Sequence, residues 1–81
     1  MNYIATFYSH FGAIRFRKIC ENAGIEAEIM PVPRRLSSSC GSCVFFRGER
    51  YMPVEPVPEE CEQIVAEEDG KYEVLYTAPG E

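Results

Sequence analysis

Hydrophobic and polar residues follow each other in this chain with two periods, one typical of strands and one typical of helices. Residues 2–8 form an uncharged run of β-branched and aromatic side chains, as expected for a strand buried on both faces. Ser9 is a preferred N-cap residue, and helical spacing continues to about Ala23, where Gly24 provides a stop. The apolar face of this helix consists of Ala13, Phe16, Ile19, Cys20 and Ala23.

Two large hydrophobic residues of this helix, Phe11 and Ile14, fall outside its apolar face. They could cover the end of a sheet or form a contact with another subunit. The sequence leaves both interpretations open.

The remaining pattern predicts three further strands, a connector and a second helix. Residues 25–30 alternate apolar and charged side chains, and residues 43–47 form a short apolar strand. Residues 48–58 contain three prolines and predict an extended connector. A second helix is predicted from Pro58 to Gly70, and residues 72–77 predict the last strand.

The resulting order, β-α-β-β-α-β, predicts an α+β fold of one domain, residues 1–81. We expect a ferredoxin-like sandwich, in which two helices cover one face of a four-stranded antiparallel sheet. The nearly apolar first and third strands would lie in its centre. The second and fourth strands would form the edges, because they carry Glu26, Glu28 and Glu73.

The net charge of −5 is unevenly distributed. Residues 1–50 hold seven Lys or Arg against four Asp or Glu, whereas residues 51–81 hold one against nine. Such a chain lacks the basic footprint of a nucleic-acid-binding protein. The opposite charges of the two halves could support a homo-oligomer that is sensitive to salt.

Membrane insertion and export are not expected from this sequence. No apolar run reaches the length of a membrane span, and the first residues lack a basic segment and a signal-peptide core. We therefore expect a cytoplasmic protein whose four cysteines are reduced thiols, metal ligands or redox groups.

The segment 32–43 combines residue types that packing alone would not explain. It holds two cysteines three residues apart, preceded by two arginines and a run of serines. The predicted fold brings Cys40 and Cys43 to Ser9, His10 and the free N–H groups of the first helix. Because thiolates are favoured near helix N-termini and arginines, a reactive thiol would lie in positive potential.

A resemblance to the small bacterial family of selenium/sulfur carrier-like proteins, a domain of unknown function, is carried by the runs Phe7–His10, Asn22–Ile25 and Met30–Gly41. It covers residues 3–47 well and residues 59–77 only as a pattern of elements. The family motif falls on Pro33, Arg34, Ser37, Ser38, Ser39, Cys40 and Gly41. The motif requires no cysteine at position 43, so the resemblance leaves open whether one thiol or two take part.

What the resemblance implies is a carrier in which Cys40 accepts sulfur or selenium as a persulfide or selenosulfide and passes it on. Positive charge from the arginines and the helix start would favour the thiolate, and Cys43 could resolve the adduct as a disulfide. The expected substrate- or anion-binding residues are Arg34, Arg35, Ser37, Ser38, Ser39, Gly41, Ser9 and His10. The implied partners are a cysteine desulfurase or a sulfur- or selenium-accepting protein.

Two alternative functions use the same cysteines. Cys40 and Cys43 have the spacing of half a zinc or iron site, although Cys20 and Cys61 fall on helix faces expected to be buried. The pair could also act in dithiol–disulfide exchange. The sequence contains no Gly-rich phosphate fingerprint and no catalytic carboxylate pair, so it favours a carrier or binding domain over an enzyme and predicts no cofactor.

Overall fold

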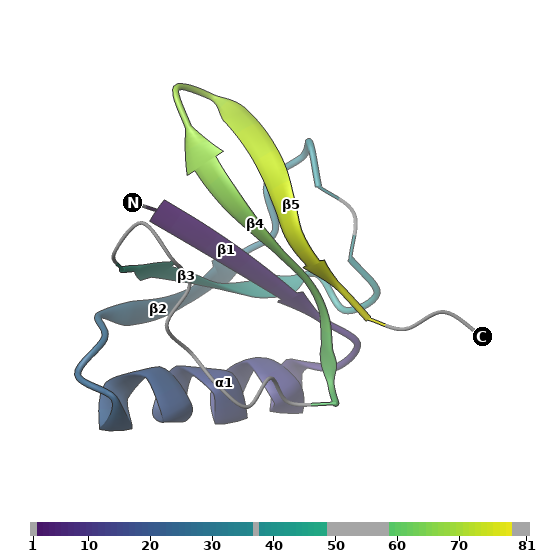
Figure 1. The fold of residues 1–81 in the computed structure, drawn as a ribbon. Helices are drawn as coiled ribbons and strands as arrows, with labels where there is room; N and C mark the ends of the chain where they lie inside the picture. The colour runs from purple at the N-terminus through teal and green to yellow at the C-terminus, as the bar shows by residue number, and fades with distance from the viewer. Residues whose placement is uncertain (1, 37, 49–58, 79–81) are drawn as a thin grey trace.

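A helix packs on one face of an antiparallel sheet in the computed structural model, which describes residues 2–36, 38–48 and 59–78 (Figure 1). The elements are β1 (Asn2–Phe7), α1 (His10–Asn22), β2 (Ala27–Pro31), β3 (Ser42–Arg47), β4 (Cys61–Glu68) and β5 (Lys71–Thr77). The strand order is β2-β3-β1-β4-β5, and neighbouring strands are antiparallel. Apart from Gly48, the connector predicted at 48–58 lies outside the described residues.

The transition from β1 into α1 confirms the strand and the helix predicted for the first 24 residues. Ser9 has an extended backbone (φ −145°), and its Oγ accepts a hydrogen bond from the Gly12 N–H at 3.2 Å. Such an N-cap stabilises a helix by about 1 kcal/mol. The helix ends at Asn22 with Ala23 as its C-cap, and Gly24 then adopts a positive φ of 78° that suits glycine.

The main core lies between α1 and the sheet. Phe16 is central to it, because its ring lies 5.3 Å from the Phe7 ring and 5.3 Å from the Phe46 ring. Full burial of such a side chain stabilises the fold by about 2–3 kcal/mol. The buried residues of this helix-side core are Tyr3, Ala5, Phe7, Ala13, Phe16, Cys20, Val44, Phe46, Cys61, Ile64 and Ala66.

A smaller core lies on the opposite face of the sheet and consists of Ile4, Cys43 and Val65. Val32 and Leu36, from the segment between β2 and β3, pack against it. That segment therefore covers the face that α1 leaves open. We call it the β2–β3 segment, residues 32–41.

The predicted ferredoxin-like sandwich with two helices is wrong, because residues 61–68 form strand β4 and not a helix. β4 pairs with β1 on one side and with β5 on the other, so the described residues form a five-stranded sheet with one helix. The predicted last strand exists as β5 and lies at a sheet edge as expected, but its neighbour is β4. The first half matches the expectation, since β3 lies between β1 and β2.

A turn signal explains why the second helix does not form. Asp69 and Gly70 join β4 to β5 and both have positive φ, 54° and 78°. An Asp-Gly pair with this geometry is a strong determinant of a two-residue hairpin. Asp69 and the two acids before it, Glu67 and Glu68, would also oppose the dipole at the C-terminal end of a helix.

The outer side of α1 carries two exposed side chains, Phe11 at 63% and Ile14 at 47%. They therefore do not cover the end of the sheet.

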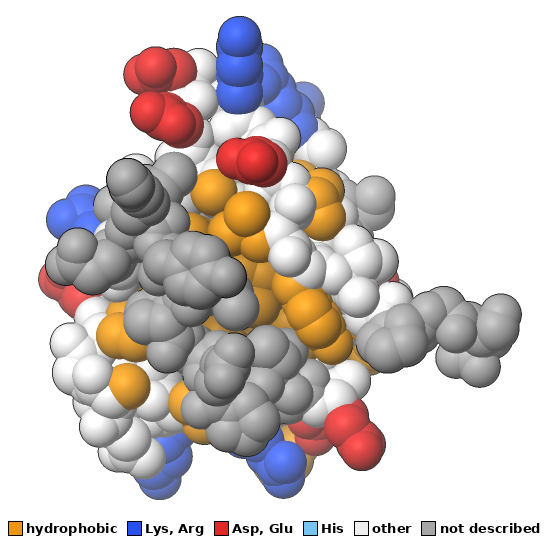
Figure 2. All heavy atoms as spheres, viewed as in Figure 1, with side chains coloured by type: hydrophobic (Ala, Val, Ile, Leu, Met, Phe, Trp, Pro, Cys, Tyr) orange, Lys and Arg blue, Asp and Glu red, His pale blue; other side chains and the backbone are white. Residues whose placement is uncertain are grey.

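No helix among the described residues is long and apolar enough to span a membrane. Figure 2 shows hydrophobic side chains gathered in the middle of the face seen in Figure 1, with acidic side chains around the β4–β5 turn.

Candidate functional site

Residues 38–42 lie across the C-terminal end of β1, at the end of the sheet where α1 begins. The hydroxyl of Ser38 donates to the Phe7 carbonyl at 3.2 Å. On the β4 side, Glu62 accepts from the Ser39 N–H at 3.2 Å and from the Ser39 hydroxyl at 3.0 Å. On the β2 side, the Val32 N–H donates to the Gly41 carbonyl at 3.1 Å. These contacts hold the backbone around Cys40 beside the end of β1 and the start of β4.

Cys40 is a partly exposed residue, and its sulfur interacts with Ser42. The Ser42 N–H donates to Sγ at 3.5 Å, and the thiol lies 3.5 Å from the Ser42 carbonyl oxygen, which can accept its proton. Between the two residues, Gly41 has a φ of +77°, and a Cβ built on it would meet no atom within 4 Å. The space beside Gly41 is therefore open, and its positive φ favours glycine.

Ser9 and His10 stand at the start of α1, and only His10 reaches the Cys40 turn directly. Its Nδ1 is hydrogen-bonded to the Ser42 hydroxyl at 3.0 Å. The Ser9 hydroxyl instead caps the helix by accepting from Gly12. The first turn of α1 thus lies against the turn that holds the sulfur, with the positive end of the helix dipole on the same side.

The structure does not bring Arg35 to Cys40. Its Nη1 donates to the carbonyl of Gly70 at 2.5 Å, in the β4–β5 turn. That turn is next to the Asn2 end of β1, whereas Cys40 is next to the Phe7 end, and the two ends are about 17 Å apart in an extended strand. Arg34 is exposed, and Ser37 lies outside the described residues.

The other three cysteines are fully buried, and their thiols are poor nucleophiles for that reason. Burial raises the pKa of Cys20 and of Cys43 to about 11, and that of Cys61 to about 12. Cys43 belongs to the core under the β2–β3 segment, and its thiol donates to the Pro31 carbonyl at 3.6 Å. Cys40 packs against the helix-side core instead, and all four thiols are free.

The structure offers the two alternative functions little support. Among the described residues, no group of three or more His, Cys, Asp and Glu side chains could hold a metal ion. The half-site spacing of Cys40 and Cys43 thus gains no third ligand there. Dithiol exchange would need Cys43 to leave a core in which it has no exposed surface.

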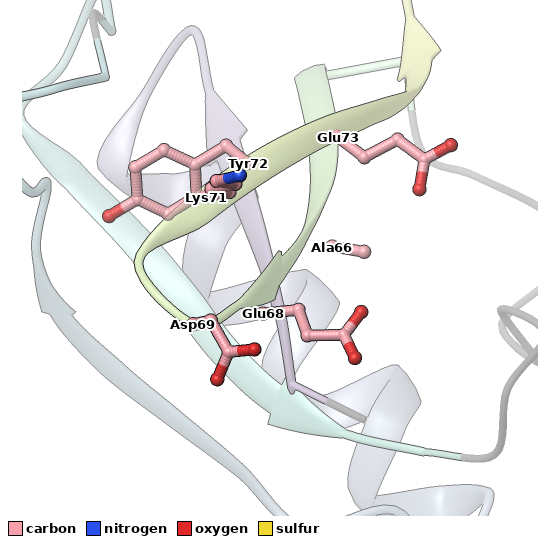
Figure 3. A pocket seen from close by; sticks show the side chains of 6 residues that line it. All are labelled: Ala66, Glu68, Asp69, Lys71, Tyr72 and Glu73. Atoms are coloured by element: carbon pink, nitrogen blue, oxygen red, sulfur yellow. The ribbon is translucent and has the colours of Figure 1, made fainter.

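A hollow of about 390 Å³ lies on the β4–β5 hairpin, away from Cys40. Figure 3 shows that Glu68 and Glu73 point to the same side of the hairpin, with Ala66 between them. The remaining lining residues are Asp69, Lys71 and Tyr72. No thiol or histidine lines this hollow, so it has no part in a cysteine site.

Glu62 is the site residue that the sequence did not reveal. It was expected on a helix, as one of several acids near its start. Its two hydrogen bonds to Ser39 depend on β4 lying beside the end of β1, which is a contact between residues 23 positions apart. Only the correct pairing of β4 could have predicted it.

Comparison with known proteins yields a family. No curated protein and no solved structure matches the chain. The model of one family, described as "Putative Se/S carrier protein-like", matches residues 2–77, which include every described element of the sheet and α1. The chain therefore belongs to the Se/S carrier protein-like family.

Proposed function

We propose that this protein carries sulfur or selenium on one thiol, that of Cys40. The observation that carries the proposal is the difference in burial among the four cysteines. Cys20, Cys43 and Cys61 have no exposed surface, whereas Cys40 is partly exposed beside an open glycine turn. Only a thiol that a partner can reach exchanges a persulfide with it.

The transfer is a thiol exchange that needs no added oxidant. The Cys40 thiolate attacks the outer sulfur of a persulfide on a donor protein, and the S–S bond of the donor breaks. The donor leaves as a thiolate, which takes up the proton that Cys40 released. Cys40 then holds the transferred sulfur as a persulfide until an acceptor thiolate attacks that outer sulfur in turn. A donor selenosulfide would deliver selenium by the same step.

The surroundings of Cys40 suit a sulfur anion. The Ser42 N–H already points at Sγ, and the start of α1 adds the positive end of a helix dipole. Ser38 and Ser39 hold the backbone through the Phe7 carbonyl and Glu62. We assign these two serines to holding the turn, and we assign the anion to the Ser42 N–H.

Cys43 has no part in this proposal. Its burial and its raised pKa of about 11 make it a poor nucleophile in the folded protein. The persulfide on Cys40 would therefore survive until a partner protein removes it. A cysteine desulfurase is the proposed donor, and a sulfur- or selenium-accepting protein is the proposed recipient.

Mass spectrometry after incubation with a cysteine desulfurase and cysteine tests the proposal. We expect the chain to gain the mass of one sulfur atom, located at Cys40 by fragmentation and removed by a thiol reductant. The Cys40→Ser variant should gain nothing, whereas Cys43→Ser should gain as much as the unaltered chain. Absence of the adduct, or its persistence in Cys40→Ser, would contradict the function.

A further inference from the structure

We propose that His10 is a positioning residue for Cys40 and acts on it through Ser42. The purpose of this role rests on the function proposed above, because a carrier needs its sulfur held in one orientation toward a partner. The role itself concerns only the state of the thiol. It can therefore be tested without any sulfur transfer.

Ser42 is the residue that holds the sulfur. Its N–H donates to Cys40 Sγ at 3.5 Å, and its carbonyl lies 3.5 Å from the same atom. When the thiol loses its proton, the N–H contact remains and stabilises the anion, while the carbonyl can no longer accept from it. The position of the Ser42 backbone therefore sets how well the thiolate is stabilised.

The sheet leaves the N–H of Ser42 unused by β2. Ser42 is the first residue of β3, and its partner across the ladder is Pro31, the last residue of β2. The Val32 N–H donates to the Gly41 carbonyl, so, by the alternation of an antiparallel ladder, Pro31 and Ser42 form a pair that exchanges no hydrogen bonds. The Ser42 N–H therefore points away from β2, and it donates to Cys40 Sγ. The neighbouring Gly41, at a positive φ, adds no side-chain contact.

His10 holds the side chain of Ser42. Its Nδ1 is hydrogen-bonded to the Ser42 hydroxyl at 3.0 Å. His10 is itself fixed as the first residue of α1, because the capping residue Ser9 accepts from Gly12 and from Ala13. The rigid start of the helix is thus connected, through an imidazole and a hydroxyl, to the N–H that points at the sulfur.

Charged and titratable groups reach this turn from three sides. His10 reaches it from α1, and Glu62 reaches it from β4 by its hydrogen bonds to Ser39. Cys43 follows Cys40 by three residues and lies in β3. Glu62 fixes the part of the turn that precedes Cys40, and His10 fixes the part that follows it. Loss of Glu62 should loosen Ser39, whereas loss of His10 should act on the sulfur through Ser42.

The rate at which iodoacetamide alkylates Cys40, followed from pH 6 to 10, tests the role. We expect His10→Ala to lower the rate at pH 7.5 by about three- to tenfold and to move the midpoint of the rate profile upward, because the N–H contact to the thiolate weakens. Ser42→Ala, which keeps the N–H and loses the hydroxyl, should do the same. His10→Asn, whose side-chain amide can still form a hydrogen bond with the Ser42 hydroxyl, should keep most of the alkylation rate of the unaltered chain. Phe11→Ala, an exposed neighbour on the helix, is the control and should have no effect.

The double variant decides whether His10 acts through Ser42. If it does, His10→Ala with Ser42→Ala should be no slower than either single variant. Effects that add, or a midpoint unchanged in His10→Ala, would overturn the proposal. Since His10 is exposed, His10→Ala should leave the thermal unfolding temperature nearly unchanged. A lowered alkylation rate in a variant with a clearly lower unfolding temperature would also contradict the proposal. A chain that fails to take sulfur but shows the coupled alkylation rates would refute the carrier function and leave the role of His10 intact.

Discussion

Glu62 binds Ser39 with both oxygens of its carboxylate, one accepting from the backbone N–H at 3.2 Å and one from the hydroxyl at 3.0 Å. The two residues belong to β4 and to the β2–β3 segment, so this pair connects the Cys40 turn to the strand that sequence analysis misassigned. The contact is exposed, and it fixes the backbone at Ser39, which is not part of a strand.

Replacing Glu62 by Ala should therefore loosen the turn more than it destabilises the fold. We expect a loss of about 0.5–1.5 kcal/mol in the free energy of unfolding, as for one or two ordinary hydrogen bonds. Hydrogen exchange at the Ser39 amide should speed up by more than global unfolding explains. Glu59→Ala is a suitable control, because Glu59 is an exposed acid that lies just before β4. Equal protection of Ser39 in the two variants would contradict the contact.

The buried thiols should make the protein lose stability in alkali. Thiols ionise near pH 9.0 in the unfolded chain, whereas in the folded chain burial raises the pKa to about 11 for Cys20 and Cys43 and about 12 for Cys61. Stability is therefore complete below pH 9 and falls as the pH rises above it, because the unfolded chain then releases protons that the folded chain keeps. Each thiol contributes up to about 1.4 kcal/mol per pH unit in that range.

Urea unfolding at pH 8, 9 and 10 under reducing conditions measures this loss. Cys61→Ala should be less stable at pH 8 but should lose less stability on going to pH 10. Tyrosine and lysine titrate in both proteins and cancel in the comparison. Parallel losses in the two proteins would show that Cys61 ionises when folded.

Gly12 occupies a place in α1 that has no room for a side chain. A Cβ built there would overlap the Cβ of Glu60 and would lie 3.3 Å from the Phe7 ring. Gly→Ala within a helix ordinarily stabilises it by about 1 kcal/mol. Here we expect the opposite, a loss of about 1–3 kcal/mol from overpacking. Thermal unfolding would show it, and combining Gly12→Ala with Glu60→Gly should recover most of the loss.

Arg35 and Arg34 are adjacent in sequence but differ in their contacts. Arg35 donates to the Gly70 carbonyl, which fastens the β2–β3 segment across the face that holds Cys43. Arg35→Ala should therefore cost about 1 kcal/mol and expose Cys43 to maleimide in the native state. Arg34→Ala, at an exposed position, is the matched control and should change neither quantity. Equal labelling of Cys43 in both variants would exclude a fastening role for Arg35.

The first half of the fold could be predicted from local signals, and the second half could not. Ser9 and Gly24 mark the ends of α1 by their own conformational preferences, which need no tertiary contact. Residues 61–68 carry an apolar pattern that suits a short helix as well as a strand. Their state was decided by the Asp69-Gly70 turn and by the open edge of β1, and only the first of these can be seen in the sequence.

The proximity of the Cys40 turn to the start of α1 depends on the first half of the fold, whereas its contact with Glu62 depends on β4. The split β1-α1-β2 unit, with β3 between its strands, is sufficient to bring Cys40 to the start of α1. The expected cationic neighbour was not predictable in the same way. Arg35 finds its partner in the β4–β5 turn, a hairpin that the predicted fold did not contain.

The β2–β3 segment closes one face of the sheet with Val32 and Leu36, and a few residues later it presents Cys40. The same short segment thus covers a hydrophobic core and positions a thiol, so a change in one role also changes the other. An insertion or deletion in this segment that moves Cys40 would also expose the core beneath Val32 and Leu36. A larger side chain at Val32 or Leu36 would in turn displace Cys40. We therefore expect the spacing from Val32 to Cys40 to tolerate insertions far less well than an ordinary surface loop.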